Sequence, residues 1–418
     1  MPVPSKCDVF AMKTIAVIGG GAAGFFAAIH CAETAPQHRV IILEKSSHLL
    51  AKVRISGGGR CNVTHACFDA RELSKRYPRG GRALIGPFTR FQPRDTVAWF
   101  EHCGVMLKTE PDGRVFPITD SSETIAQCLE QAALAAGVQV RTKCGVERIA
   151  TCARGFDLAL GNGESLACDA LLIASGGCRT SSAGELIAAL GHKIEPPVPS
   201  LFTFHIESEW LRELPGISVD PVEAGIPGTK LRERGPLLVT HTGVSGPAIL
   251  RLSAWGAREL HECGYEFPLR IAWLPDVTEQ QLLTEFQQRR TAMPTRQLVN
   301  APVAKLPVRL WEKLIAASGI ASDARWNTLT RDGAHALARM LCRTEFAVRG
   351  KSLNKEEFVT CGGVSLREVD FKTMQSRIQP RLYFAGEVLD IDGITGGFNF
   401  QSAWTTGWIA GQHIAQTL

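Results

Sequence analysis

Three consecutive glycines stand beside side chains that are able to do chemistry. The stretch RISGGGRCN begins at Arg54 and follows its glycines with an arginine, a cysteine and an asparagine. Glycine costs conformational entropy on folding but leaves backbone N–H groups bare, which suits the ribityl chain and ring of a flavin. The candidates for flavin contact are Ser56, Gly57, Gly58, Gly59, Arg60, Cys61 and Asn62. The alternative is a structural glycine turn whose Arg60 pairs with a remote carboxylate.

Three side chains are candidates for catalytic groups. Arg60 and Cys61 lie beside the glycines, and His241 lies at the end of an expected strand. A histidine at such a place can also cap or hydrogen-bond a turn, so two interpretations of His241 stay open. We predict no metal site, because the thirteen cysteines contain no C-x-x-C pair.

A nucleotide-binding pattern lies upstream of these residues. Residues 14–18 predict a buried parallel strand, residues 22–35 a helix and residues 40–43 a second strand. The G-x-G-x-x-G between the first strand and the helix allows a tight turn and lets a pyrophosphate approach the helix N-terminus. Glu44 then comes at the position of a ribose-binding acid. The predicted contacts are Gly19, Gly21, Ala22, Ala23, Gly24, Glu44 and Lys45, with Lys52 further along.

The cofactor is predicted to be FAD rather than NAD. In NAD-binding domains the alternation of strand and helix usually continues after the second strand, whereas residues 46–65 read as a long polar loop. Long loops without secondary structure in compact domains are commonly functional. We expect this loop to hold the flavin non-covalently.

Later segments return to the same site. Residues 165–177 predict an apolar strand ending in a small-residue turn, and residues 398–415 predict a helix with small residues for close packing. That helix would direct its N-terminus toward the flavin and stabilise the anionic reduced ring. The further predicted contacts are Val146 for the adenine, Gly176, Gly386, Glu387, Gly396, Gly397, Phe398 and Asn399.

The FAD-binding domain is therefore discontinuous, over 1–194 and 357–418, with an insert over 195–356. Alternation over 200–208 and 235–246 predicts strands of a small barrel or sandwich, and residues 278–318 predict helices. We place the β-rich lobe at about 195–276 and 325–356 and the helical piece at about 277–324.

Composition limits the remaining possibilities. The chain has 418 residues, 7% aromatics and a net charge of +5, which does not favour a nucleic acid as partner. No stretch approaches the roughly 18–20 apolar residues of a membrane span, and the N-terminus does not resemble a signal peptide. We expect a cytoplasmic monomer or homodimer that does not bind a membrane.

The motifs together resemble the BaiN-like flavoproteins, a bacterial FAD-dependent group that includes aminoacetone oxidases and a bile-acid double-bond reductase. The matching motifs are GGGAAG, SGGGRCNVT, GRVFP, HTGVSGPAIL, VTCGGVSLREVDFKTM and GEVLDIDGITGGFNFQSAW. Residues 174–192 depart from the family, which usually has a proline and a longer glycine-rich run there. The resemblance implies an α/β, Rossmann-like FAD-binding domain with an inserted β-barrel-like lobe that carries a helical subdomain.

The expected function is an FAD-dependent oxidoreductase that acts on a small-molecule substrate by hydride transfer through flavin N5. If NAD(P)H is the electron donor, we expect it to bind only transiently, because no second G-x-G-x-x-G unit lies between Gly177 and Leu382. The alternatives are a flavin-dependent amine oxidase that uses O2, a flavin-dependent RNA-modifying enzyme and an FAD-binding redox sensor.

Overall fold

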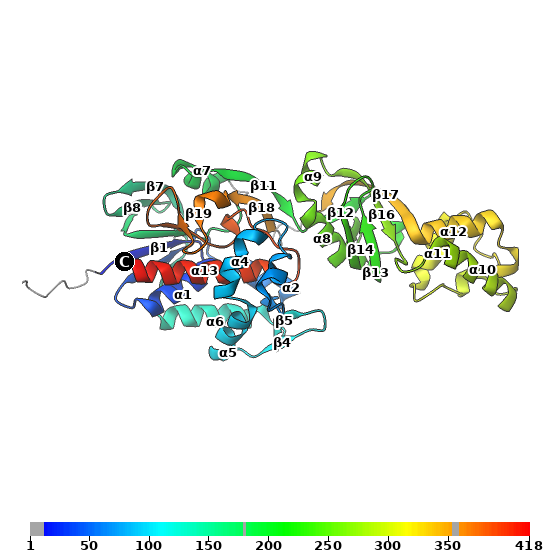
Figure 1. Ribbon diagram of the computed structural model, residues 1–418, viewed down its shortest axis with the longest axis horizontal. Helices are drawn as coiled ribbons and strands as arrows, with labels where there is room; N and C mark the ends of the chain where they lie inside the picture. Colours follow the sequence, from blue (N-terminus) through cyan, green and yellow to red (C-terminus); the bar gives the residue numbers. More distant parts are fainter. Residues whose placement is uncertain (1–11, 179–180, 353–358) are drawn as a thin grey trace, which may run out of the picture. The chain divides into compact units, whose positions relative to one another are not determined.

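The computed structural model describes residues 12–178, 181–352 and 359–418. Two features of the sequence analysis fall outside these ranges: the boundary between 356 and 357, and residues 179–180 of the stretch that departs from the family. Contacts divide the chain into two compact units, Met1–Val198 with Val359–Leu418, and Pro199–Phe358. The chain leaves the first unit and returns to it after the second (Figure 1).

A seven-stranded sheet forms the centre of the first unit. Strand β1 (Thr14–Ile18) pairs in parallel with β2 (Arg39–Leu43) on one side and with β10 (Ala170–Ile173) on the other. Across the sheet the order is β19 (Val369–Asp370), β20 (Gln375–Ser376), β21 (Leu382–Phe384), β10, β1, β2 and β6 (Gln139–Arg141). This arrangement confirms the predicted Rossmann-like α/β fold.

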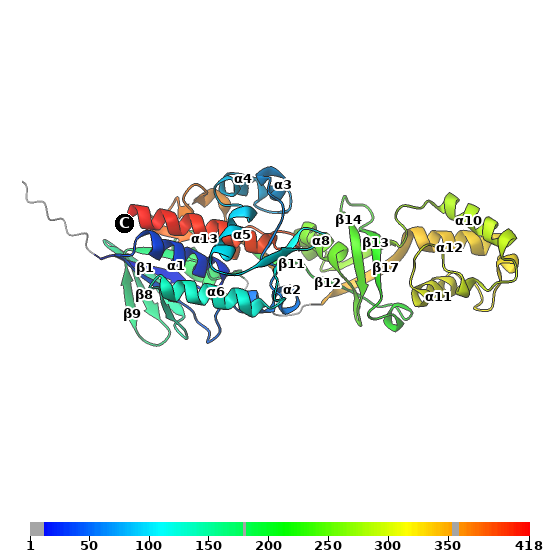
Figure 2. The same cartoon turned by 90° about the horizontal axis from the view of Figure 1, so that it is seen from below.

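Two helices from opposite ends of the chain pack together in this unit. Helices α1 (Ala22–Thr34) and α13 (Phe398–Thr417) lie side by side (Figures 1 and 2). A Cβ built on Gly411 would lie 2.4 Å from the carbonyl oxygen of Ala27, so the predicted close packing is confirmed. The other helices are α2 (Ala51–Gly59), α3 (Ala70–Ser74), α4 (Gly81–Arg90), α5 (Pro93–His102), α6 (Ser122–Ala135) and α7 (Ser181–Ala189).

Three small sheets complete the first unit. The strand expected over 165–177 is divided at Asp169, whose buried carboxylate accepts a hydrogen bond from the Thr14 N–H at 2.9 Å. The segment before Asp169 therefore joins a different sheet from the segment after it. The small sheets contain β3 (Thr64–His65), β5 (Arg114–Pro117) and β4 (Leu107–Thr109); β7 (Val146–Cys152), β8 (Gly155–Leu160) and β9 (Ser165–Cys168); and β11 (Ile194–Ser200) with β18 (Val359–Val364).

The second unit is a closed barrel with helices, as predicted for the insert. The strand order is β12 (Thr203–Ile206), β15 (Gly243–Ser245), β14 (Arg232–Val239), β13 (Ser218–Gly225), β16 (Glu266–Ala272) and β17 (Thr344–Ser352). Helices α8 (Pro247–Trp255) and α9 (Ala257–Glu262) follow β15, while α10 (Glu279–Ala292), α11 (Val308–Ala317) and α12 (Arg331–Arg343) lie between β16 and β17 in sequence. One buried cluster runs through barrel and helices.

The helical piece is longer than predicted. We placed residues 325–356 in the β-rich lobe, but a further helix, α12, occupies Arg331–Arg343, and the strand begins only at Thr344. Three arginines within α12 hide its apolar periodicity in the sequence, although Leu337 and Leu341 are fully buried. The name helical piece is used below for residues 279–343.

Candidate dinucleotide site

The turn between β1 and α1 has the tight packing that G-x-G-x-x-G predicts. A Cβ built on Gly19 would lie 2.4 Å from the Ala174 oxygen, and one built on Gly24 would lie 2.0 Å from the Gly19 oxygen. Among the described residues, no atom lies within 4 Å of a Cβ built on Gly21. Space is therefore open beside Gly21, at the N-terminus of α1, where no side chain caps the backbone N–H groups. Such a helix end favours a diphosphate.

Glu44 stabilises this turn from the end of β2. Its Oε2 accepts the Gly20 N–H at 2.9 Å and its Oε1 accepts the Ser46 N–H at 2.8 Å. The sequence predicts Glu44 as a ribose acceptor and gives no sign of this structural role. A carboxylate has further lone pairs, so contact with a ribose remains compatible with both bonds.

The residues predicted near the adenine lie next to Glu44. A Cβ built on Gly145 would lie 3.1 Å from the Lys45 Cβ, and the Cys144 N–H donates to the Glu44 carbonyl at 2.9 Å. The structure therefore brings Val146, the first residue of β7, beside the end of β2.

The sequence analysis predicted one long loop over residues 46–65. The structure shows instead that the glycine-rich stretch follows a short helix. Residues 51–55 are helical, and the helix breaks at Ser56, where ψ is 151°. Gly57, Gly58 and Gly59 then take φ values of 58°, 68° and 83°, the left-handed region that glycine enters at little cost. No described atom lies within 4 Å of a Cβ built on Gly58 or Gly59, so their backbone borders open space.

Arg60 holds this segment in place through a carboxylate, as the structural alternative proposed. Its guanidinium donates to Glu110 at 2.8 Å and lies over the Phe116 ring at 4.0 Å. Arg54 makes similar contacts on the other side of the glycines, with Glu130 at 2.8 Å and with Glu123. Both arginines therefore connect the glycine-rich stretch to neighbouring elements.

Cys61 is fully buried and does not have the character of a nucleophile. Its φ is 59°, and none of its surface is exposed. Burial raises the pKa of the Cys61 thiol to about 12, against a weak opposing effect of a hydrogen bond with Ser56. The thiolate is the reactive form of cysteine, so the Cys61 side chain is inert near neutral pH.

The C-terminal double glycine lies against the same segment. A Cβ built on Gly397 would lie 2.6 Å from the Thr64 oxygen and 2.8 Å from the Asn62 side-chain oxygen. With its amide oriented to satisfy its neighbours, Asn62 accepts the Gly397 N–H at 3.0 Å and donates to Thr64 and Val115 carbonyls. Asn62 thereby joins the glycine-rich stretch to the start of α13.

Two of the residues predicted at this helix start have structural contacts. Asn399 accepts the Gly393 N–H and donates to the Gly393 carbonyl, both at 2.8 Å, so its amide closes the loop between these residues. The Phe398 ring is buried and stacks on His65, with ring centres 4.7 Å apart. Both side chains therefore contact other parts of the protein. The backbone N–H groups at the start of the helix have no side-chain cap and remain available to a cofactor.

Glu387 and Lys52 meet although they are far apart in sequence. The Lys52 ammonium forms an ion pair with Glu387, whose other oxygen accepts the Thr360 N–H at 2.9 Å. Gly386, just before, packs on Ala23 of α1, where a built Cβ would lie 2.8 Å from the Ala23 Cβ. The structure therefore brings the predicted ribityl acid and the predicted cation to one place.

Several polar residues of this region gave no sequence signal. Gln401 is fully buried; its oxygen accepts from Thr64 at 2.5 Å and from Thr96 at 2.9 Å. Asp392 is fully buried and pairs with Arg79. Both contacts fix the polypeptide around the double glycine, and only the three-dimensional pairing of distant residues reveals them.

The geometry fits FAD. Open space borders Gly176 as it does Gly21, Gly58 and Gly59, and the buried Ser175 hydroxyl has no hydrogen-bond partner among the described residues. The carboxyl ends of β1 and β10 are adjacent, which is where open α/β sheets bind ligands. Gly21 and the start of α1 would hold the diphosphate, Glu44 the ribose, and the Gly57–Gly59 backbone with Glu387 the ribityl chain.

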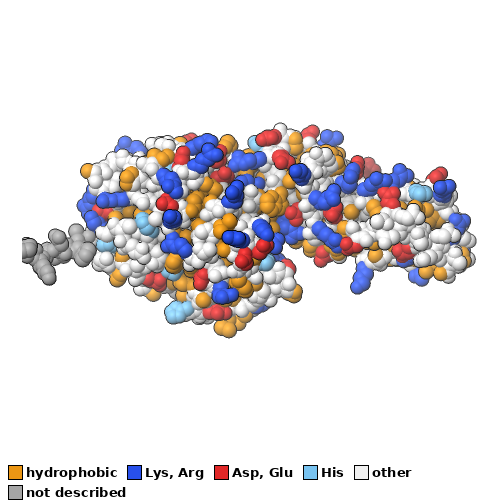
Figure 3. Space-filling view, in the orientation of Figure 1, with side chains coloured by type: hydrophobic (Ala, Val, Ile, Leu, Met, Phe, Trp, Pro, Cys, Tyr) orange, Lys and Arg blue, Asp and Glu red, His pale blue; other side chains and the backbone are white. Residues whose placement is uncertain are grey.

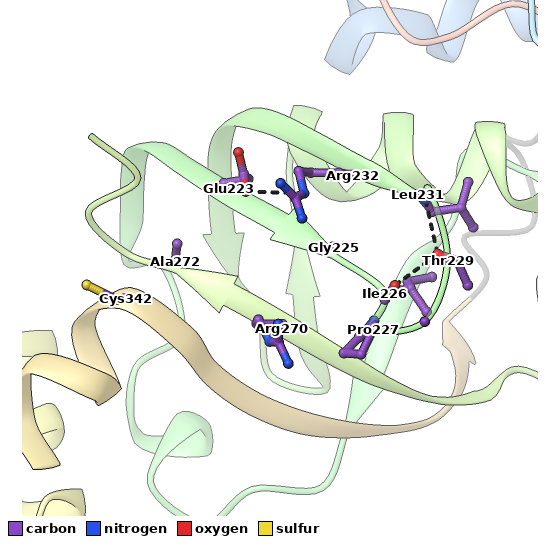
Figure 4. A pocket seen from close by; sticks show the side chains of 11 residues that line it. Glu223, Gly225, Ile226, Pro227, Thr229, Leu231, Arg232, Arg270, Ala272 and Cys342 are labelled. Atoms are coloured by element: carbon purple, nitrogen blue, oxygen red, sulfur yellow. Dashed lines mark hydrogen bonds and ion pairs between the residues drawn. The ribbon is translucent and has the colours of Figure 1, made fainter. Parts of the chain in front are cut away.

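Two features of the second unit, His241 and a small pocket, are candidates for a binding role. His241 is exposed in the turn between β14 and β15, where the Thr240 N–H donates to the Gly243 carbonyl at 2.8 Å. The pocket lies at the β13–β14 hairpin, where Arg232 points toward Glu223 at 3.4 Å (Figure 4). Arg270 in the same pocket is paired with Glu345 at 2.8 Å. Because both pocket arginines have carboxylate partners, this pocket does not form an anion site.

Solved structures with this fold are flavoenzymes. The chain aligns with the 3-ketosteroid-delta4-(5alpha)-dehydrogenase of Rhodococcus jostii RHA1 with a TM-score of 0.53 and 14% identity, covering 98% of this chain and 99% of that one. A flavocytochrome c3 fumarate reductase gives a TM-score of 0.51 and 17% identity, covering 98% of this chain and 79% of that one. At such identities the likeness establishes the fold.

Sequence comparison establishes the family. Residues 13–413 match the family described as HI0933-like protein Rossmann domain. The ribosomal RNA dihydrouridine synthase of Escherichia coli K12 is 32% identical over 410 residues, 95% of this chain and 97% of that protein. The 3-dehydro-bile acid delta(4,6)-reductase of Clostridium scindens is 28% identical over 413 residues, 97% of this chain and 100% of that protein. The chain belongs to the HI0933-like family, in agreement with the BaiN-like resemblance, and is an FAD-dependent oxidoreductase.

Other features are reported for the described residues alone. Within them no helix has the length and hydropathy needed to cross a membrane. The twelve cysteines in that part of the chain are free thiols. It also contains no group of three or more metal-ligating side chains.

Proposed function

We propose that this enzyme reduces a carbon–carbon double bond conjugated to a carbonyl group. FAD, when bound and reduced, supplies a hydride from its N5 to the β-carbon, and a proton adds to the α-carbon. Two relatives are named as a bile-acid reductase and a dihydrouridine synthase. Both names describe the addition of two hydrogen atoms to such a bond. The observation that carries the proposal is the open space beside Gly21, Gly58, Gly59 and Gly176, which fits FAD, in a chain whose relatives are named for such reductions.

The residues of the first unit would orient the flavin and stabilise its reduced form. The uncapped N-terminus of α13, reached through Gly397, offers backbone N–H groups and a positive dipole end to an anionic ring. The Lys52 ammonium is paired with Glu387 and holds that carboxylate in place. Cys61 does not serve as the acid, because its thiol is fully buried.

We further propose that NAD(P)H reduces the flavin as a transient guest. The sheet pairings of the second unit are antiparallel, so the described residues contain a single parallel sheet with a glycine-rich nucleotide turn. NAD(P)H would then bind weakly and leave before the substrate enters.

Anaerobic reduction of the purified yellow protein tests both proposals. NADH and NADPH should bleach the flavin absorbance, and an oxo-steroid with a conjugated double bond, or RNA, should restore it. The product should gain two hydrogen atoms by mass spectrometry. Reoxidation by O2 alone, with neither acceptor reduced, would favour the amine-oxidase alternative. Tight binding of NAD(P)H beside FAD in a second site would contradict the transient-guest proposal.

A further inference from the structure

The positive surplus of the chain lies in one segment. The helical piece, residues 279–343, has ten Lys and Arg against five Asp and Glu, and the surplus of the entire chain is also five. The rest of the chain is therefore electrically balanced. Eight of the ten basic residues are arginines. The small net charge, which did not favour a nucleic acid, thus conceals a concentrated basic region.

Helix α12 arranges part of this charge in a line. Arg331, His335, Arg339 and Arg343 follow one another at four-residue spacing, which places them as neighbours along one side of a helix. The three arginines are exposed. Leu337, Ala338 and Leu341 lie on another side of α12 and are completely buried in the core of the second unit. These four basic positions are called the α12 stripe below.

Few carboxylates neutralise the stripe. Arg343 pairs with Glu279 at 2.8 Å, and the Arg339 Nε–H donates to the His335 carbonyl at 3.4 Å. Arg331 has no ion pair among the described residues, and its acidic neighbour Asp332 lies in the first turn of α12, where the helix dipole favours a negative charge. Lys and Arg side chains also lie along the upper edge of the helical piece in Figure 3.

We propose that the α12 stripe binds the phosphodiester backbone of an RNA that carries the uracil to be reduced. This inference rests on the proposed function, because the uracil C5=C6 bond is conjugated to a carbonyl. Arginine binds phosphate oxygens through paired N–H groups and is only weakly hydrated. Two relatives that span nearly the whole chain are named as ribosomal RNA dihydrouridine synthases.

The burial of the apolar side of α12 favours RNA over a membrane. Helices that lie on lipid insert an apolar face and add electrostatic attraction to it. In α12 that face is already covered by protein, so the stripe offers only charge and hydrogen bonds to its partner. Those are the interactions that a phosphate backbone requires.

The test compares the unmodified protein, a double variant of the stripe and a single-charge control, all in FAD-loaded form. Arg331→Gln with Arg339→Gln removes two charges of the stripe, and Arg148→Gln removes an exposed charge on β7 of the first unit as the control. Binding of a fluorescein-labelled, uridine-rich single-stranded RNA is followed by anisotropy over a series of salt concentrations. We expect the double variant to bind roughly 10-fold more weakly and its log–log salt slope to fall by about 1.4, that is about 0.7 per lost phosphate contact. The control should match the unmodified protein.

The outcomes separate this inference from the proposed function. Unchanged flavin absorbance and unchanged reduction by NAD(P)H show that the double variant is folded. If its RNA affinity and salt slope equal those of the unmodified protein, the docking inference is wrong even where dihydrouridine still forms. Stronger binding to phosphatidylserine vesicles than to RNA in the same salt would also overturn it. If RNA binds through the stripe but neither uracil nor a free enone is reduced, the proposed function fails and the docking surface stands.

Discussion

The two glycine-rich segments of the first unit use glycine for different physical reasons. In the turn after β1, the missing side chains of Gly19 and Gly24 allow the backbone to pack against itself. In the segment after α2, Gly58 and Gly59 have positive φ values and border open space. A glycine that is tightly surrounded serves the fold, while a glycine beside open space exposes backbone N–H groups to a ligand. Gly21 belongs to the second kind although it lies in the first segment.

The largest effect is expected for Gly24→Val. Even the Cβ of a new side chain would lie 2.0 Å from the Gly19 oxygen, which belongs to the backbone and cannot move aside as a flexible side chain could. The loss of stability should be about 4 kcal/mol or more, enough to prevent folding of the unit. Soluble expression and far-UV circular dichroism provide the measurement. A folded, yellow Gly24→Val protein would show that the tight packing of this turn is not required.

Gly21→Val should separate folding from cofactor binding. The Gly21 φ of −97° suits any residue, and the described protein leaves the space around its Cβ open. The variant should therefore fold with nearly normal stability but lose FAD, because its side chain occupies the place of the pyrophosphate. We expect at least about 100-fold weaker binding, on the order of 3 kcal/mol, in a fluorescence titration of the apoprotein with FAD. Normal recovery of yellow protein would contradict the site.

The sequence predicted most of the scaffold because each signal there is local. The strand at Thr14–Ile18 and the helix at Ala22–Thr34 follow directly from apolar runs bounded by glycines. The discontinuity of the first domain could also be predicted from the sequence. The strand at Leu382–Phe384 and the double glycine after it resemble the segments by which other flavoproteins complete this sheet. The predicted class of fold is confirmed by the sheet order.

The side-chain roles were less predictable because they depend on partners that are distant in sequence. Asn399 was expected at the cofactor but bonds to Gly393, and Arg60 bonds to Glu110. Nothing in the neighbouring sequence identifies these partners. The length of α12 was missed for a related reason: burial of Leu337 and Leu341 depends on the other helices of the second unit.

Cys61 combines a property of each of the two kinds of glycine. It shares the left-handed backbone of the segment after α2, yet its side chain is as buried as those around Gly24. Because its folded pKa of about 12 is above the unfolded value, it adds stability below about pH 9, and this is lost as the pH rises toward 12. Cys61→Ala should therefore lessen the alkaline loss of stability by at most about 1.4 kcal/mol per pH unit in denaturant titrations. An unchanged pH dependence would show that Cys61 is accessible in the folded protein.

Alkylation of the native protein examines the same burial directly and is expected to produce the smallest change. Iodoacetamide at neutral pH should modify Cys152, which is exposed, within minutes to hours, while Cys61 stays unmodified until the protein unfolds. Peptide mass spectrometry reads both sites in one sample, so Cys152 is the internal control. Equal modification of the two would mean that the segment Ser56–Asn62 opens readily in solution. Its glycines would then serve mobility, and the distinction between glycines that serve the fold and glycines that serve a ligand would fail for the segment after α2.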